Sequence, residues 1–339
     1  MRHNLISLHR SSPTCRRPWA TGGFVLLVAM TAWTVLSVAA RPAVVQLGIM
    51  GDSLSFSDGS DYGQNPNWHT QLENGGRVAI GPTANQAVDG ATTADLLAQS
   101  QPILALVEAQ QIDYSVVEMG SNDATSMAID LVLNHIPIPA DFSATVAQRV
   151  TSTMAALAAA DPAHHLHQVV ANIPDIVQTP ALQSAIVFLG VSQQDVNAIR
   201  QTILDTNALI ETQALQNGIP VLDLFKLIDE VGTQPLTLAG VTTAVADLFP
   251  DDGFHPSSLI HGLTANMFID AVDRGYGAML DPLSDQEIVS NAGLVPLTAG
   301  PTFFDVSPYV IVPEPSSAAL TLLAVLLMWR MVARRFSSH

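Results

Sequence analysis

Five short apolar runs, separated by segments with helical patterns, constrain the fold of this chain more than any other feature. They cover Val44–Met50, Arg77–Ile80, Tyr114–Met119, Gln168–Ile173 and Pro220–Leu224. Runs of this kind are typical of strands that are buried on both faces, and the helical segments between them are long enough to connect parallel strands. The sequence therefore predicts an α/β fold: a flavodoxin-like three-layer α/β/α sandwich with a small, mainly parallel five-stranded sheet.

The segments between these runs supply the helices. Thr92–Leu106 has apolar residues at helical spacing and is interrupted by Pro102, and Ser143–Ala160 is rich in alanine. Ser192–Gln216 begins with a serine that can cap a helix and ends shortly before Gly218, a residue that commonly follows a helix. We expect all three segments to pack against the sheet.

The N-terminal 40 residues have the pattern of an export signal. Basic residues precede an apolar stretch, Phe24–Ala40, which ends in small residues. Cleavage is expected after Ala39 or Ala40, and an uncleaved membrane anchor is the alternative. Cys15, the only cysteine, lies inside this segment, so the mature protein would have neither disulfides nor a thiol nucleophile.

The C-terminus, "VPEPSSAALTLLAVLLMWRMVARRFSSH", combines a Pro-Glu-Pro break, an apolar run over Ala318–Trp329 and a cluster of arginines. This run of twelve residues, apolar except for Thr321, is shorter than the roughly 20 that a spanning helix needs, although a snorkelling Arg330 would extend it to Ala333. The pattern resembles the PEP-CTERM sorting signal of Gram-negative-type bacteria that secrete exopolysaccharide.

This resemblance has consequences for partners and location. It implies that residues 312–339 form a sorting tail with a short transmembrane helix, which anchors the chain transiently until a membrane protease cuts near the Pro-Glu-Pro. Residues 291–311 would then be a linker. A plain tail anchor is the alternative. Both readings place the body outside the cytoplasm, in the periplasm, on the cell surface or in the medium.

Charge excludes one class of partner. The chain has 13 lysines and arginines against 30 aspartates and glutamates, a formal net charge of −17. A surface this acidic repels phosphate backbones, so we expect no nucleic-acid binding.

Three polar clusters carry groups suited to acyl transfer. Gly51-Asp52-Ser53 follows the first apolar run, "GSND" (120–123) follows the third, and "DGFHPS" (252–257) lies beyond the last. In parallel sheets ligands bind beyond the carboxyl ends of the strands, where the first two clusters fall. A serine hydroxyl becomes a nucleophile when an imidazole removes its proton, and a carboxylate orients that imidazole. Ser53, His255 and Asp252 are the candidates for these roles, because the aspartate lies three residues before the histidine.

Acyl transfer also needs hydrogen-bond donors for the oxyanion. The backbone N–H of Ser53 and the side-chain amide of Asn122 are candidates. So is the backbone N–H of Gly90, where the absence of a Cβ lets the chain approach a ligand closely.

Together these segments resemble the SGNH hydrolases, also called GDSL esterases and lipases, over about residues 44–275. The four family blocks correspond to "GDSLS" (51–55), "NQAVDGATT" (85–93), "GSND" (120–123) and "DGFHPS" (252–257). The resemblance implies that Ser53 is the nucleophile, His255 the base and Asp252 its orienting carboxylate. It also implies that Ser53, Gly90 and Asn122 form the oxyanion hole. Its fold, a small parallel sheet between helices, agrees with the strand pattern and would occupy residues 41–290.

The nucleophile block differs from the Gly-x-Ser-x-Gly elbow of the α/β-hydrolases, so a looser loop is expected around the serine. The resemblance implies a serine esterase or lipase (a hydrolase of ester bonds, EC 3.1.1.-) that works through an acyl-enzyme, and the two chain ends imply that it is exported. The ester substrate would be lipid-like or an acylated carbohydrate. This mechanism requires neither a metal nor a cofactor. The alternative is a non-catalytic extracellular matrix or cell-surface protein that retains the fold.

Two further segments leave alternatives open. Residues 124–142, apolar and broken by two prolines, are either a flap over an acyl pocket or a packed helix followed by a loop. The "HHLH" sequence at 164–167 suggests a metal site, but no cysteine or carboxylate has matching spacing, so surface or capping histidines are favoured. His261 competes with His255 for the role of base but lacks an aspartate three residues before it.

Overall fold

The computed structural model describes residues 44–56, 66–250 and 252–313. The chain divides into two units, Met1–Ala43 and Val44–His339, and all of the described residues belong to the second. The predicted export signal and nearly all of the predicted sorting tail therefore lie outside the described residues. Within the described ranges, no helix is both long enough and apolar enough to cross a bilayer.

Among the described residues, six strands form the central sheet, in the order β2-β1-β3-β4-β5-β8. They are β1 (Val45–Gly51), β2 (Val78–Ala79), β3 (Tyr114–Glu118), β4 (His167–Ala171), β5 (Val221–Leu222) and β8 (Val310–Ile311). The first five are parallel, and their order is the flavodoxin-like one. The predicted fold class and the five predicted strands are confirmed, with β2 and β5 shorter than the apolar runs that predicted them.

The sixth strand comes from the segment predicted as a linker. Val310 and Ile311 pair antiparallel with β5, and the buried Tyr309 donates its hydroxyl hydrogen to Glu230 at 2.6 Å. Two paired residues are too few to give a strand pattern in the sequence. A small hairpin, β6 (Leu236–Leu238) and β7 (Val241–Thr243), was likewise not predicted.

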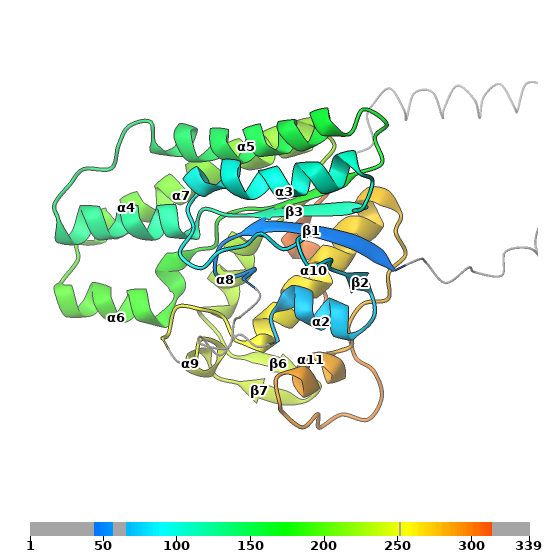
Figure 1. Ribbon diagram of the computed structural model, residues 1–339. Coiled ribbons are helices and arrows are strands. Elements are labelled where there is room, and N and C mark those ends of the chain that lie inside the picture. The colour runs from blue at the N-terminus through cyan, green and yellow to red at the C-terminus, as the bar shows by residue number, and fades with distance from the viewer. Residues whose placement is uncertain (1–43, 57–65, 251, 314–339) are drawn as a thin grey trace, which may run out of the picture. The chain divides into compact units, whose positions relative to one another are not determined.

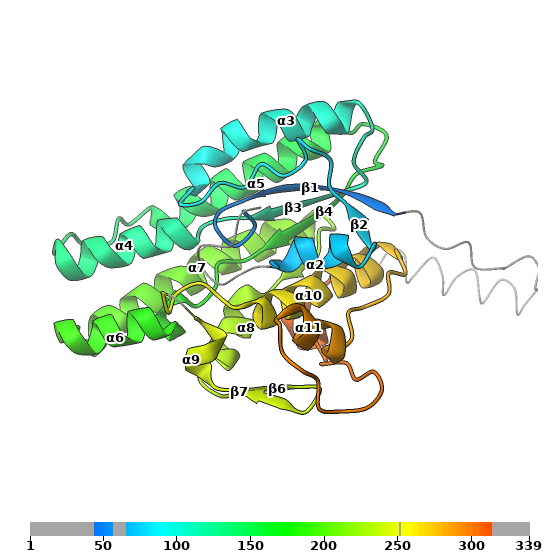
Figure 2. The same ribbon diagram turned by 60° about the horizontal axis from the view of Figure 1, so that its bottom comes forward.

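Helices cover both faces of the sheet (Figure 1). One face carries α3 (Leu96–Glu108), α5 (Phe142–Ala160) and α7 (Gln193–Gln216), which correspond to the three predicted helices. Ser192 caps α7 as expected, because its side chain accepts a hydrogen bond from the backbone N–H of Asp195. The other face carries α2 (Trp68–Asn74), α8 (Leu224–Val231) and α10 (Ser258–Tyr276), with α11 (Asp285–Asn291) beside them (Figure 2).

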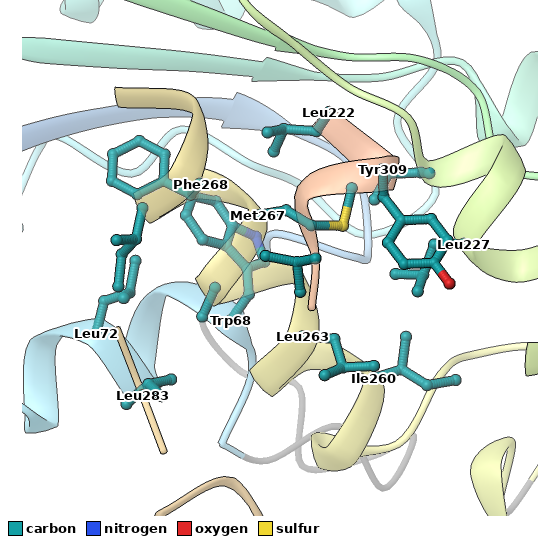
Figure 3. Packing of buried hydrophobic residues seen from close by; sticks show 14 of the residues in the cluster. Trp68, Leu72, Leu222, Leu227, Ile260, Leu263, Met267, Phe268, Leu283 and Tyr309 are labelled. Atoms are coloured by element: carbon teal, nitrogen blue, oxygen red, sulfur yellow. The ribbon is translucent and has the colours of Figure 1, made fainter. Parts of the chain in front are cut away.

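Helix α10 is the central helix of that second face. Nearly all of its side chains up to Val272 are buried, and Phe268 packs against Trp68 of α2 with ring centroids 5.8 Å apart. Figure 3 shows these two rings beside Leu72 of α2. Burial of one such apolar side chain stabilises the fold by about 1.5–3 kcal/mol. Because α10 begins at Ser258, directly after the "DGFHPS" turn, this packing also fixes the position of that turn.

Candidate active site

The first polar cluster forms a tight turn at the carboxyl end of β1. The side chain of Asp52 accepts a hydrogen bond from the backbone N–H of Leu54 at 3.1 Å, which holds the turn closed. A Cβ at Gly51 would lie 2.8 Å from the carbonyl oxygen of Glu118 on β3, so only glycine allows this approach of the two strands. Ser53 lies in this turn, directly beyond the carboxyl end of β1, with 5% of its surface exposed.

The third cluster brings a histidine to this serine. Asp252 accepts backbone hydrogen bonds from Phe254 at 2.8 Å and from His255 at 2.9 Å through Oδ1. Its other oxygen, Oδ2, lies 2.6 Å from Nδ1 of His255, and Nε2 of His255 lies 2.8 Å from Oγ of Ser53. The fold thus joins Ser53, His255 and Asp252 in one chain of hydrogen bonds, although the serine and the histidine are 202 residues apart.

The electrostatics of Asp252 determine which ring nitrogen carries the proton. Burial acts to raise the pKa of Asp252, but the hydrogen bonds from the His255 backbone and ring and from the Phe254 backbone outweigh it, so the pKa lies below its ordinary value. The carboxylate is therefore charged at neutral pH and accepts the hydrogen of Nδ1. A neutral imidazole in this tautomer presents a lone pair on Nε2 to the Ser53 hydroxyl.

The residues predicted to donate to an oxyanion are linked through the 88–91 loop. The backbone N–H of Val88 donates to the carbonyl oxygen of Gly51 at 3.1 Å, and Nδ2 of Asn122 donates to the carbonyl oxygen of Ala91 at 2.9 Å. Gly90 lies between these two anchors with a φ of +72°, a conformation that favours glycine. The Asn122 amide carries a second hydrogen that can serve a ligand.

Asp123, whose role the sequence did not predict, clamps the second cluster to this loop. Its carboxylate accepts hydrogen bonds from the backbone N–H and from the hydroxyl of Thr93, both at 2.8 Å. Gly120, which precedes α4 (Ser121–Leu133), has a φ of +126°, and a Cβ there would lie 2.8 Å from Ile173. The conformation at Gly120 and the clamp at Asp123 together fix Asn122, which lies between them.

A pair of buried carboxyl groups, Asp52 and Glu118, lies beneath the serine turn and was also not predicted. Oε2 of Glu118 accepts a hydrogen bond from Oγ of Ser55 at 3.0 Å, and that hydroxyl accepts one from Nε1 of Trp68 at 3.0 Å. Burial raises the pKa of both carboxyls, and for Glu118 the neighbouring Asp52 raises it further. The pair therefore carries at most one negative charge near neutral pH. The sequence contained one sign of this pair, because Glu118 is an acidic residue inside the apolar run "YSVVEM".

His69 of α2 lies under the same turn. Its Nε2 is 3.0 Å from the carbonyl oxygen of Ser55 and 3.2 Å from Nδ2 of Asn85, and its side chain is buried. Burial lowers the pKa of His69 to about 4, although the hydrogen bond to Ser55 acts in the opposite direction. His69 is therefore neutral at physiological pH and donates to Ser55. Nothing in the sequence pattern around His69 indicated this role.

A narrow cavity of about 40 Å³ lies beside Ser53. None of the described residues in 124–142 line it. Instead, α4 buries Ala124, Met127 and Ala128 against its neighbours and is followed by a loop, so this segment is the packed helix and loop rather than a flap over the cavity. His261, the competing histidine, lines the cavity from α10, and burial lowers its pKa to about 3.

The "HHLH" segment lies elsewhere. The ring of His167 stacks on Tyr276 with centroids 4.3 Å apart. Across the described ranges, no group of three or more His, Cys, Asp or Glu side chains is arranged to hold a metal ion.

Comparisons with solved structures give distant matches. Axe2, an acetylxylan esterase from Geobacillus stearothermophilus, is 15% identical, with a TM-score of 0.47 over 71% of this chain and 97% of its own. LAE5, an alpha/beta hydrolase enzyme from the metagenome of Lake Arreo, is 16% identical, with a TM-score of 0.46 over 71% of this chain and 98% of its own. The structure of TesA is 17% identical, with a TM-score of 0.42 over 68% and 99%. No curated protein matches the sequence.

The family comparison is more informative, because it is made on the sequence itself. A family model described as GDSL-like Lipase/Acylhydrolase matches residues 47–268, which is more than half of the chain and includes all four polar segments discussed above. The chain therefore belongs to the GDSL-like lipase/acylhydrolase family and is a hydrolase of ester bonds.

Proposed function

We propose that this protein hydrolyses carboxylic esters with Ser53 as the nucleophile, His255 as the general base and Asp252 as the residue that orients the base. The observation that supports this assignment most strongly is the 2.8 Å distance between Oγ of Ser53 and Nε2 of His255, together with the charged Asp252 on the far side of the ring. Hydrogen bonds of this length between nucleophile, base and carboxylate are the geometry that acyl transfer to a serine requires.

The reaction proceeds in two halves. Oγ of Ser53 attacks the ester carbonyl carbon while its proton moves to Nε2 of His255, which gives a tetrahedral intermediate. The protonated imidazole then passes this proton to the departing alcohol oxygen, and the acyl group stays on Ser53. In the second half, water gives a proton to His255 and attacks the acyl carbon, and the proton returns to Ser53 as the acid leaves.

The negative oxygen of each tetrahedral intermediate needs fixed donors. We assign this role to the backbone N–H groups of Ser53 and Gly90 and to Nδ2 of Asn122. The bond from Asn122 to Ala91 and the bond from Val88 to Gly51 support the assignment, because they tie the loop that carries Gly90 to Asn122 and to the turn that carries Ser53. Donors that are already held in position stabilise the oxyanion more than mobile donors, since they do not have to reorganise during the reaction.

Hydrolysis of p-nitrophenyl butanoate by the purified protein tests the assignment. Ser53→Ala and His255→Ala should each abolish the activity, whereas Ser184→Ala, an exposed serine on α6 (Pro180–Leu189), should retain it. Activity that survives in Ser53→Ala would refute the nucleophile. An unmodified protein that hydrolyses no ester in a panel of lipid-like and acylated-carbohydrate substrates would support the non-catalytic alternative.

We also propose that the protein is exported, and that its C-terminal tail is recognised by a membrane-bound sorting protease. The basic and apolar N-terminus and the Pro-Glu-Pro pattern support this proposal, and apart from Val312 and Pro313 these segments lie outside the described residues. The intact mass of the protein recovered from the producing cells tests it. A mature N-terminus at Ala40 or Arg41 is expected, and a chain that still begins at Met1 would contradict cleavage.

A further inference from the structure

The cavity beside Ser53 offers information on the substrate that the four family segments do not contain. We infer that it is the acyl pocket of this enzyme and that it limits the acid part of the ester to about four uncharged carbons. This inference rests on the proposed function, because it assumes that Ser53 is acylated.

The cavity is lined by the nucleophile and by side chains from several elements around it. Ser53 and Leu54 line it from the turn after β1, and Ile176 lines it from the short 3₁₀ segment Ile176–Gln178 that follows β4. Leu227 of α8 and Ile260 of α10 also line it. A group attached to Oγ of Ser53 therefore has an adjacent space that leads into the molecule.

The lining is suited to an alkyl chain. Most of it is apolar and is contributed by Ile176, Leu227, Ile228, Phe249, Phe254 and Ile260. Each methylene group buried against such a surface should raise kcat/KM by about fourfold, provided that it is buried in the transition state.

The size of the cavity sets the limit on chain length. One water-sized group occupies about 10–15 Å³, so a cavity of about 40 Å³ takes about three such groups. Three carbons beyond the carbonyl make a butanoyl group. Two residues of the wall, Leu227 and Ile260, are at most 1% exposed and are packed among other core side chains, so this part of the wall has little room to yield (Figure 3).

The shape of the site indicates which half of the ester enters the cavity. The alcohol has to leave, and water has to take its place, while the acyl group is still bound to Ser53. A largely apolar space beside the nucleophile suits the half that stays. None of residues 88–91 lines the cavity, and this loop is open to solvent, since Val88 is 52% exposed and Gly90 is also exposed. We therefore place the alcohol on the side of the 88–91 loop.

The cavity also excludes charged acyl groups. None of the described residues that line it is a lysine or an arginine, and a carboxylate in an apolar space without a cation is strongly destabilised. Glu118 is the acidic residue in its wall, and burial and the neighbouring Asp52 raise its pKa. A negative acyl group would meet no compensating charge from this side chain.

The test is kcat/KM of the full-length protein for p-nitrophenyl acetate, butanoate, hexanoate and octanoate, all below their aggregation limits. We expect a rise of about 15-fold from acetate to butanoate and a fall from butanoate to hexanoate and octanoate. The p-nitrophenyl monoester of succinic acid, whose acyl group also has four carbons, should react at least about tenfold more slowly than the butanoate.

A matched pair of variants on α10 tests the pocket itself. Ile260→Ala removes part of the wall and should move the maximum to hexanoate. Leu263→Ala removes an equally buried side chain of the same helix that does not line the cavity, and it should leave the maximum at butanoate. Ile260→Val is the milder replacement if Ile260→Ala does not fold, and it should raise the hexanoate-to-butanoate ratio.

The outcomes separate the two proposals. Loss of hydrolysis of every ester would refute the proposed function, and the pocket with it. Hydrolysis that peaks at octanoate, or an Ile260 variant whose chain-length profile equals that of Leu263→Ala, would refute the pocket and leave the esterase. A series of acetate esters with different alcohols completes the test. If Ile260→Ala changes how kcat/KM depends on the alcohol and leaves its dependence on acyl length unchanged, the assignment of the acyl half to the cavity is overturned.

Discussion

Acidification should destabilise this protein through His69, the buried histidine under the serine turn. The pKa of His69 is about 4 in the folded chain, against an ordinary value of 6.5, because burial disfavours the charged ring. The unfolded chain therefore takes up a proton as the pH falls below about 6.5, whereas the folded chain does not do so until about pH 4. The contribution to stability is fully present above pH 6.5 and is lost progressively as the pH falls towards 4.

The size of this loss follows from the two pKa values. At pH 5 the unfolded chain has gained its proton over about 1.5 pH units, and each unit corresponds to about 1.36 kcal/mol. The free energy of unfolding should therefore fall by about 2 kcal/mol from pH 7 to pH 5 through His69 alone. A natural domain has only about 5–15 kcal/mol in total, so this loss is a substantial fraction.

His69→Gln isolates the effect, because glutamine keeps a side-chain N–H for the carbonyl oxygen of Ser55 but does not titrate. Urea unfolding of both proteins at pH 7, 6 and 5 gives the difference in their free energies of unfolding, which should shrink by about 2 kcal/mol across the range. Other titrating groups contribute to both proteins and cancel in this difference. If the free energies of unfolding of the two proteins differ by the same amount at pH 7, 6 and 5, the reasoning is refuted.

Three substitutions test other parts of the site. Asn122→Ala should lower kcat by on the order of 10²–10³-fold, since it removes an oxyanion donor, and a change confined to KM in steady-state kinetics would speak against that role. Asp252→Asn should lower kcat by up to about 10⁴-fold, because an amide no longer selects the tautomer of His255. An effect below tenfold would remove Asp252 from the triad. Gly120→Ala should lower the free energy of unfolding by about 1–3 kcal/mol, owing to its positive φ and the contact with Ile173, and an unchanged urea midpoint would contradict this.

The sequence predicted the sheet well, because its strands are continuous apolar runs bounded by polar residues. The parallel strands and the three predicted helices formed where that pattern placed them. Strand β8 escaped prediction because it is only two residues long and owes its place to pairing with β5 and to the burial of Tyr309. Tertiary contacts of this kind leave no periodic signal.

The groups proposed for catalysis could be named from the sequence, whereas the residues that hold them in place could not. Ser53, His255 and Asp252 could be named because a nucleophile, a base and a carboxylate are chemically distinctive, and because the family resemblance orders them. Asp123 and His69 act through bonds to segments that are distant in the sequence or to backbone atoms, so their partners appeared only with the fold.

The cavity was even harder to predict from the sequence. Its wall combines side chains from segments that are far apart in the sequence. Ile176, Leu227 and Ile260 are examples, and none of them is unusual in its own sequence context. The size of such a space depends on how closely helices pack on the sheet. For this reason the sequence left the acyl length open, whereas the structure yields a testable limit.

The central claim is that the imidazole of His255 activates the hydroxyl of Ser53. Labelling with a fluorophosphonate, followed by mass spectrometry of the digested protein, tests it most directly. We expect one adduct per chain, on Ser53, and its loss in His255→Ala. A chain that takes up no label, or that carries it on a different serine, would contradict this claim.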